Sequence, residues 1–202
     1  MRKTSVKMER TSTQAICLTG LFTAIICLGT MFLKLPVPTM TDGYINFGDG
    51  FIIIISVMFG KKYGAVSGAA GSALADILLG SPHWAVFTFI IKGLMGYVTG
   101  LVKDYSDENS RFFSVRNVSA AFICEIIMVA GYFICGVLLK GYFMTPDSEK
   151  FIAAGASSLF EYGVIQATSS FFQNLIQAGG SIVIFYFLGL ALHNAKIAKL
   201  SK

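Results

Sequence analysis

The stretch Trp84–Tyr97, WAVFTFIIKGLMGY, decides the fold class of this chain. It is apolar, aromatic or small apart from Lys92, as expected for a helix that crosses a lipid bilayer. A lysine at such depth costs about 2.5–3.5 kcal/mol on insertion scales unless a partner pairs with it. Asp76 and Glu125 lie in similar apolar runs. Ionisable groups buried in a membrane chain indicate a polar interior, and therefore a pathway or a binding pocket.

The composition supports the same class. Hydrophobic residues make up 54% of the 202 residues and charged residues 13%, whereas soluble domains carry about 25% charged residues. The apolar run Ala15–Leu33 is longer than the ~7–15-residue core of a signal peptide, so we interpret it as a retained first span. The net charge of +5 fits the positive-inside rule, and no nucleic-acid partner is expected. The four cysteines lie in apolar runs without ligand spacing, which is typical of small buried hydrophobes.

Six apolar segments have roughly the length of a membrane span, about 17–25 residues. We expect spans at Gln14–Leu33, Tyr44–Gly60, Tyr63–Leu79, Trp84–Val102, Val118–Leu139 and Gly163–Leu192. The second and third are short and are joined by a tight turn at Lys61–Lys62. The last is overlong, so we expect its beginning to be a surface helix or a tilted entry. The sequence therefore predicts an all-α integral membrane protein, a compact bundle of six transmembrane helices that forms a single domain over residues 1–202.

The distribution of lysine and arginine predicts that both termini are cytoplasmic. With the N-terminus inside, most cations fall in inner segments, and only Lys34, Lys140 and Lys150 fall in outer ones. Residues 1–13 then form a basic cytoplasmic N-terminus, residues 14–192 the bundle and residues 193–202 a basic cytoplasmic tail. The protein is expected to be a multi-pass protein of the bacterial cell membrane.

Two outer connections are long enough to serve as lids. In Lys34–Gly43, Pro36 and Pro38 favour an extended path. In Gly141–Tyr162, Pro146 and the acids that follow it favour the start of a short amphipathic helix.

Polar side chains inside the expected spans form the candidate pocket, and each has a structural alternative. Asp76 and Lys92 either form a structural ion pair, or Lys92 faces a pocket and meets a ligand. Glu125 is either the floor of a pocket or a hydrogen-bonding group between helices, and Tyr132 lies two turns further along the same face. The last span is rich in polar side chains that either line a polar interior or join helices: Gln166, Thr168, Ser169, Gln173, Asn174 and Gln177.

Aromatic residues surround Lys92 and suit a flat ligand. Trp84 and Phe87 lie on the same segment, although Trp84 and His83 also fit an aromatic belt at the membrane interface. Asp49 lies between two glycines, which permit close backbone approach. Motifs of hydrolases, metalloproteases and P-loop enzymes do not occur, and with only two histidines a histidine-based metal site is not expected.

A family resemblance rests on YINFGDGFIIIISVMFGKKYGAVSGAAGSALADILLG (residues 44–80) and SPHWAVFTFIIKGLMGYVTGL (residues 81–101). The basic turn after the second span, the small-residue-rich third span with its aspartate and the aromatic opening of the fourth resemble the S components of energy-coupling factor (ECF) vitamin transporters. The resemblance is strongest over Tyr44–Leu101. It implies a six-helix subunit that binds one vitamin from outside, docks on a membrane coupling subunit with two ATPases, and releases the vitamin inside by toppling.

The resemblance also implies roles for particular residues. The family's alanine-x3-alanine docking motif has its nearest match in Gly20 and Ala24. The chain itself is expected to bind no cofactor, while the partner subunits use ATP. The segment NFGDG and Lys92 resemble S components for pyridoxine or hydroxymethylpyrimidine, with riboflavin next. The candidate substrate-binding residues are Asn46, Asp49, His83, Trp84, Phe87, Lys92, Glu125, Tyr132, Gln166, Gln173 and Asn174.

Two other functions remain open from the sequence. A stand-alone secondary transporter could use Asp76, Lys92 or Glu125 as a proton relay, although the two halves show no convincing repeat of the kind common in such proteins. An intramembrane enzyme could use Asp76 and Glu125 as a carboxylate pair. Nothing in the sequence supplies the additional ligands or histidines such a site needs, so we do not expect an enzyme.

Overall fold

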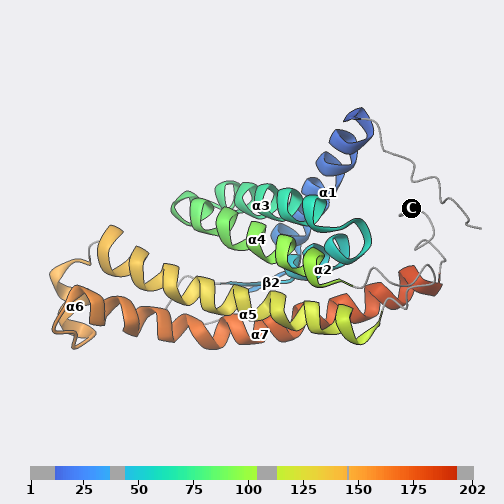
Figure 1. The fold of residues 1–202 in the computed structure, drawn as a ribbon. Coiled ribbons are helices and arrows are strands. Elements are labelled where there is room, and N and C mark those ends of the chain that lie inside the picture. Colours follow the sequence, from blue (N-terminus) through green and yellow to red (C-terminus); the bar gives the residue numbers. More distant parts are fainter. Residues whose placement is uncertain (1–11, 37–43, 104–112, 145, 195–202) are drawn as a thin grey trace, which may run out of the picture.

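The computed structural model describes residues 12–36, 44–103, 113–144 and 146–194, which are mostly helical (Figure 1). The basic ends at residues 1–11 and 195–202, the segment 37–43 with Pro38, and the loop at 104–112 lie outside the described residues. The elements in chain order are α1 (Ser12–Phe32), β1 (Lys34–Pro36), β2 (Tyr44–Asn46), α2 (Gly48–Phe59), α3 (Lys61–Leu78), α4 (Pro82–Val102), α5 (Val115–Leu138), the π-helix η1 (Leu139–Phe143), α6 (Ser148–Ala153) and α7 (Leu159–Asn194).

Four of the described helices are long and apolar enough to cross a membrane. They are α1, α4, α5 continued by η1, and α7. At 1.5 Å per residue the 12-residue α2 spans about 18 Å, which is shorter than a hydrocarbon core of ~30 Å. The 18-residue α3 is rich in glycine, alanine and serine. The all-helical bundle is thus confirmed, whereas the count of six spans and the cytoplasmic position of the termini stay predictions.

The second expected span was wrong at its beginning. Tyr44–Asn46 is a strand that pairs antiparallel with Lys34–Pro36, so these residues form a two-stranded ribbon rather than the first turn of a helix. The extended path predicted at Pro36 is confirmed by this pairing. The side-chain Oδ1 of Asn46 accepts a hydrogen bond from the backbone N–H of Gly48 at 3.2 Å. This Asx-type turn ends the strand and starts α2 two residues later.

The tight turn after α2 lies one residue earlier than expected. Gly60 has φ +91°, a left-handed conformation that favours glycine, and Lys61 already begins α3. The side chain of Lys103, just after α4, donates to the carbonyl oxygen of Val57 at 3.1 Å. This bond satisfies a carbonyl in the last turn of α2, where no intrahelical partner is available.

Small residues let α3 and α4 pack backbone against backbone. A Cβ added at Gly96 of α4 would overlap the carbonyl oxygen of Gly64 in α3, and one added at Gly100 would overlap the backbone of Lys61. Gly71 of α3 approaches α1 in the same way, because an added Cβ would lie 2.7 Å from the carbonyl oxygen of Thr23. The small residues of α3 therefore let neighbouring helices pack closely inside the bundle.

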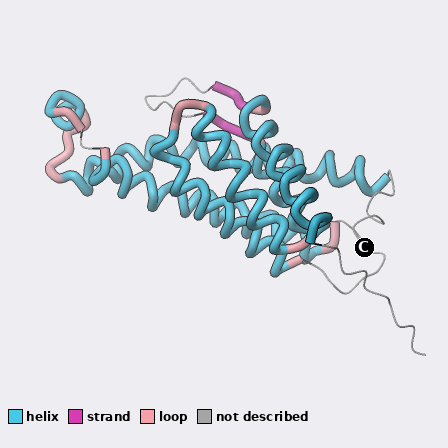
Figure 2. Tube along the Cα trace, turned by 90° about the horizontal axis from the view of Figure 1, so that it is seen from above, coloured by secondary structure: helices cyan, strands magenta, loops and turns pink. Residues whose placement is uncertain are grey.

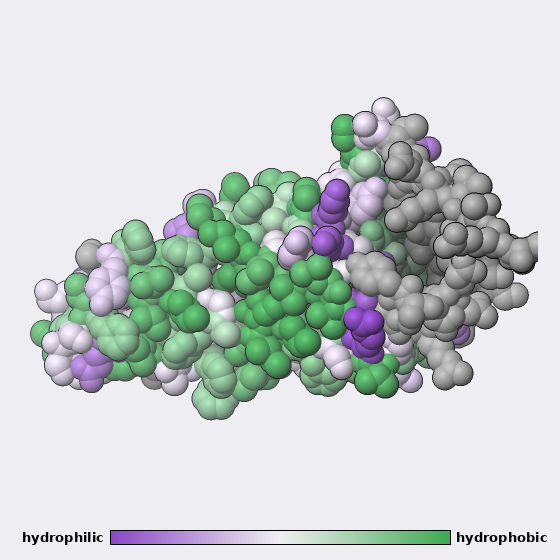
Figure 3. Space-filling model, in the orientation of Figure 1, coloured by the Kyte–Doolittle hydropathy of each residue, from purple (hydrophilic) through white to green (hydrophobic). Residues whose placement is uncertain are grey.

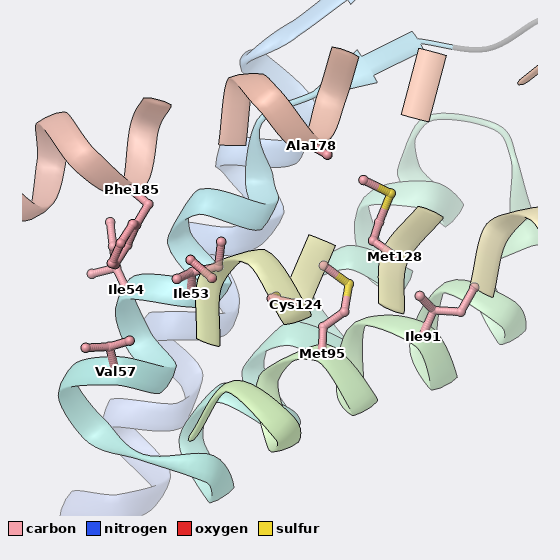
Figure 4. Close-up of a cluster of buried hydrophobic side chains, with 10 residues drawn as sticks. Ile53, Ile54, Val57, Ile91, Met95, Cys124, Met128, Ala178 and Phe185 are labelled. Carbon is pink, nitrogen blue, oxygen red and sulfur yellow. The ribbon is translucent and has the colours of Figure 1, made fainter. Parts of the chain in front are cut away.

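The helices form two groups that meet at a shared core. α3 and α4 lie side by side across the α5–α7 pair, and α5 and α7 extend beyond them at the end where α6 lies (Figures 1 and 2). Side chains from α2, α4, α5 and α7 point toward one another in the core (Figure 4). Its buried members include Ile53, Met95, Cys124, Met128 and Phe185.

The outer connection after α5 contains the predicted short helix. Asp147 precedes α6 and its side chain accepts a hydrogen bond from the backbone N–H of Lys150 at 2.8 Å. This bond holds the pKa of the Asp147 carboxyl below its usual value. The span expected at Gly163–Leu192, with a surface helix or a tilted entry at its beginning, is part of one continuous 36-residue helix from Leu159, so its beginning is not a separate helix. The tilted entry stays a prediction.

The surface of the bundle is apolar around its middle. Hydrophobic residues cover the centre of the face in Figure 3, and hydrophilic residues gather toward its ends. Large apolar side chains such as Ile126, Phe172 and Phe187 are more than half exposed. A surface of this kind suits contact with lipid.

Candidate functional site

The charged centre of the site is an ion pair between Lys92 of α4 and Asp49 of α2. The Nζ of Lys92 donates to Oδ1 of Asp49 at 2.6 Å, and the two residues are only 1% and 0% exposed. The ammonium also lies 5.1 Å from the ring centroid of Tyr132, within the range of a cation–π contact. The buried lysine is therefore compensated by Asp49, an acid that the sequence did not pair with it.

The glycines beside Asp49 explain why this carboxylate reaches the centre of the bundle. A Cβ added at Gly48 would overlap the hydroxyl of Thr30 in α1, and one added at Gly50 would lie 2.6 Å from a methyl carbon of Ile184 in α7. With glycine at both positions, the first turn of α2 fits tightly between α1 and α7. Asp49 is then buried beside α4.

The side-chain amide of Gln177 forms hydrogen bonds with the ion pair on one side and with Asn46 on the other. The Nε2 of Gln177 in α7 donates to Oδ2 of Asp49 at 2.8 Å. The Oε1 of Gln177 accepts from the backbone N–H of Asn46 at 3.2 Å and from Nδ2 of Asn46 at 3.3 Å. Lys92, Asp49, Gln177 and Asn46 therefore form one connected network that joins α4, α2, α7 and β2.

Aromatic side chains lie next to this network. The ring centroids of Trp84 and Tyr132 are 5.9 Å apart, and those of Trp84 and Phe87 are 6.3 Å apart. The hydroxyl groups of Tyr132 and Thr88 share a hydrogen bond of 3.0 Å. Tyr132 thus contacts the ammonium with its ring and is held in place through its hydroxyl.

A cavity of about 410 Å³ opens beside the network and the aromatic residues. Its size falls in the usual range for small-molecule sites, about 300–1,000 Å³. Six of its lining residues were candidate binding residues from the sequence: Asn46, His83, Trp84, Tyr132, Gln173 and Asn174. The cavity therefore combines aromatic surface with side-chain amides, a combination that can stack a flat ring and form hydrogen bonds at its edge.

Five candidates from the sequence do not line this cavity. Lys92 and Asp49 are buried behind it, and Phe87 packs on Trp84. The backbone carbonyl of Gln166 accepts hydrogen bonds from two serine hydroxyls of its own helix. Glu125 is 3% exposed and faces a different hollow, an apolar groove between α5 and α7. Neither carboxyl oxygen of Glu125 has a hydrogen-bond partner among the described residues.

The structure adds lining residues that were not among the candidate binding residues. The polar ones are Asp76, Ser81, Thr88, Lys140, Ser170 and Gln177, and the others are Gly80, Gly136, Met144 and Ala167. Gln177 lies one helical turn beyond Gln173, so the spacing of amides in the last span was the signal that pointed to it. Lys140 belongs to the π-helix η1. Such turns are frequent at functional sites, but no pattern in the sequence indicated this one.

The candidate docking face on α1 is accessible in the described part of the chain. Gly20 and Ala24 are both exposed, and a Cβ added at Gly20 would meet nothing within 4 Å. In Figure 1 the first part of α1 projects away from the other helices.

Comparisons with known proteins place the chain among transport proteins. A family model described as "ECF-type riboflavin transporter, S component" matches residues 10–194. An uncharacterised protein of Pyrococcus woesei, from the gap 3′ region, is 30% identical over 167 residues, which are 83% of this chain and 93% of the relative. The thiamine precursor transporter HmpT of Lactococcus lactis subsp. cremoris (strain MG1363) is 28% identical over 136 residues, 67% of this chain and 74% of that protein. A UPF0397 protein of Leuconostoc citreum (strain KM20) is 29% identical over 102 residues, 49% of this chain and 52% of that protein.

Proposed function

Because this chain belongs to the family of S components of ECF-type riboflavin transporters, we propose that it binds a small aromatic vitamin or vitamin precursor in the cavity beside Trp84 and Tyr132. Membership of the family makes the chain a transport protein of the cell membrane rather than an enzyme. The observation that carries the proposal is the cavity itself, in which two aromatic rings 5.9 Å apart adjoin several side-chain amides.

The proposed substrate is hydroxymethylpyrimidine, a precursor of thiamin. One relative is named as a thiamine precursor transporter, and a single heteroaromatic ring suits both the aromatic surface of Trp84 and the amides of Gln173, Asn174 and Gln177. Pyridoxine has a similar ring with hydroxyl groups and is the next candidate. Riboflavin is kept as a third candidate because the matching family model is named for it.

The proposed partners are the vitamin, an ECF membrane coupling subunit and two ATPases that use ATP. In this proposal the S component receives the vitamin from outside, docks through the α1 face at Gly20 and Ala24, and releases the vitamin inside by toppling in the membrane. The exposed small residues on α1 support the docking step, because small side chains allow helices to approach closely in lipid. Family membership favours this arrangement over the stand-alone proton-coupled carrier considered from the sequence.

A binding titration tests the proposed function directly. The chain contains a single tryptophan, and that residue, Trp84, lines the cavity. Its fluorescence in the purified, detergent-solubilised protein should therefore change in a saturable way when the correct vitamin is added. Hydroxymethylpyrimidine, pyridoxine and riboflavin are titrated in turn, and small molecules extracted from the purified protein are analysed by mass spectrometry.

Two variants link the binding signal to the cavity. Tyr132→Phe keeps the tryptophan and removes the hydroxyl bonded to Thr88, so it should weaken binding while leaving the fluorescence readout intact. Phe89→Ala is the matched control, because Phe89 lies on the same helix as Trp84 but is 52% exposed on the surface. A wild-type protein that binds none of the three vitamins and carries none after purification would contradict the proposed function.

A further inference from the structure

The side-chain amides in the hydrogen-bond network behind the cavity have a defined orientation. The groups at the two ends of the network determine which way each amide turns its oxygen. At one end the backbone N–H groups of Asn46 and Gly48 are donors and cannot act as acceptors. The first bonds to Oε1 of Gln177 and the second to Oδ1 of Asn46. These bonds favour the orientation in which both side-chain amides turn their carbonyl oxygens toward the start of α2, and a second contact at the other end of the network is needed to hold Gln177 in it.

At the other end Asp49 imposes the same direction. Its Oδ1 accepts from the ammonium of Lys92 and its Oδ2 accepts from Nε2 of Gln177. Ammonium and amide nitrogens have no acceptor capacity, so both oxygens of Asp49 act as acceptors and the group is a carboxylate. A flipped Gln177 would place its oxygen against this carboxylate and its NH₂ against a backbone N–H. An acceptor would then face an acceptor, and a donor would face a donor.

We propose that Asp49, held by Lys92, is a positioning residue that makes the cavity present N–H donors to its ligand. This inference rests on the proposed function and concerns the same cavity. The amide nitrogens of Gln177 and Asn46 each carry a second hydrogen beyond the one used in the network, and both residues line the cavity. The Oε1 of Gln177 already accepts two hydrogen bonds from Asn46, and the Oδ1 of Asn46 accepts one from the N–H of Gly48.

The inference specifies the chemistry of the ligand at this end of the cavity. The ligand atoms that meet Gln177 and Asn46 are hydrogen-bond acceptors, such as a ring nitrogen without hydrogen or a carbonyl oxygen. A ligand that presents N–H groups to both amides would leave donors facing donors in a buried site, and such pairs are strongly disfavoured. Asp49 and Lys92 thus determine specificity through Gln177 without touching the ligand.

Two double variants separate this role from simple stabilisation of the fold. Asp49→Leu/Lys92→Met removes both charges and also the acceptor for Nε2 of Gln177. Asp49→Asn/Lys92→Met removes both charges but keeps a carbonyl oxygen at position 49 that can accept the same bond. The probes are hydroxymethylpyrimidine and two analogues in which one or the other ring nitrogen is replaced by C–H, each titrated against the fluorescence of Trp84.

The wild type should bind at least one of these analogues about tenfold more weakly than the parent compound, a loss typical of one hydrogen bond. The asparagine variant should keep most of this discrimination, and the leucine variant should reduce it to about twofold or less. Equal discrimination in all three proteins would overturn the inference, as would equal binding of all three compounds by the wild type. A merely structural role would change the melting temperature without changing the ratio of affinities between the compounds.

A measurement without ligand keeps the inference testable if the proposed function fails. Failure of the function is recognised when wild-type protein binds none of the three vitamins. In protein labelled with ¹⁵N-glutamine, the side-chain NH₂ signal of Gln177 is assigned by its loss in Gln177→Glu. Its hydrogens should exchange slowly in the wild type and in the asparagine variant, and faster in the leucine variant. Equal exchange in the three proteins would overturn the inference on its own.

Discussion

Removing one member of the Lys92–Asp49 pair should destabilise the protein far more than removing both. The pair is 2.6 Å apart and almost fully buried. At an effective dielectric constant of ~20, Coulomb's law gives an attraction of about 6 kcal/mol at that distance, and desolvation of the two ions offsets much of it. Lys92→Met or Asp49→Asn alone leaves an unpaired buried charge, which costs about 3–5 kcal/mol.

The double variant Asp49→Asn/Lys92→Met carries neither charge and should recover most of the lost stability, because neutral replacements of buried pairs are often tolerated. The assay is thermal unfolding in detergent. The melting temperature falls by about 2–4 °C per kcal/mol of destabilisation, so each single variant should unfold roughly 6–20 °C below the wild type. Lys150→Met is the matched control, since it breaks an ion pair with Asp147 whose side chains are 72% and 59% exposed. It should leave the transition almost unchanged. A double variant as unstable as the sum of the singles would refute the reasoning.

Three further predictions follow from the described residues. Gly96→Ala should destabilise the bundle by about 1–3 kcal/mol or more in the thermal unfolding assay, because the added Cβ would overlap the backbone of α3. Gly179→Ala is the control: its added Cβ meets nothing within 4 Å, so its melting temperature should stay unchanged. Ala24→Trp should reduce co-purification with an ECF coupling subunit and leave vitamin binding unchanged; unchanged co-purification would remove α1 from the docking step. The Asp147 carboxyl has a lowered pKa, so its contribution to α6 is complete above about pH 4 and is lost as the pH falls through the lower folded value. The protection of the Lys150 N–H against hydrogen exchange, relative to its intrinsic rate at each pH, should fall there, and Asp147→Ala should remove that change in protection.

The sequence predicted much of the helical framework because length, apolar content and helix-breaking residues are local properties. The first, fourth and fifth spans lie within a few residues of the expected bounds, and the short helix after Pro146 is where its capping aspartate predicts. The errors arose where a non-local contact decides the backbone. The sequence of Tyr44–Asn46 predicts the start of a span. Its backbone is extended instead because it pairs with the strand Lys34–Pro36.

The candidate site was predicted in part for the same reason. Trp84, Tyr132 and the amides Gln173 and Asn174 were candidate binding residues, and the structure brings them to one cavity. Glu125 follows the same sequence pattern but lies behind an apolar groove. Which face of a helix looks inward could not be read from segments that are apolar all round.

The apolar runs of this chain were enough to predict a helical membrane protein with buried charges, because a lysine and two carboxylates inside such runs are tolerated in a bilayer when they face the interior of a bundle. The identity of the acid that meets Lys92, by contrast, depends on how the helices pack. Asp76 is nearer along the chain, but the glycines around Asp49 admit α2 between α1 and α7 and bring its carboxylate within 2.6 Å of the ammonium. Pairing of buried charges depends on how closely backbones approach, and that distance is set by contacts between helices rather than by any one segment.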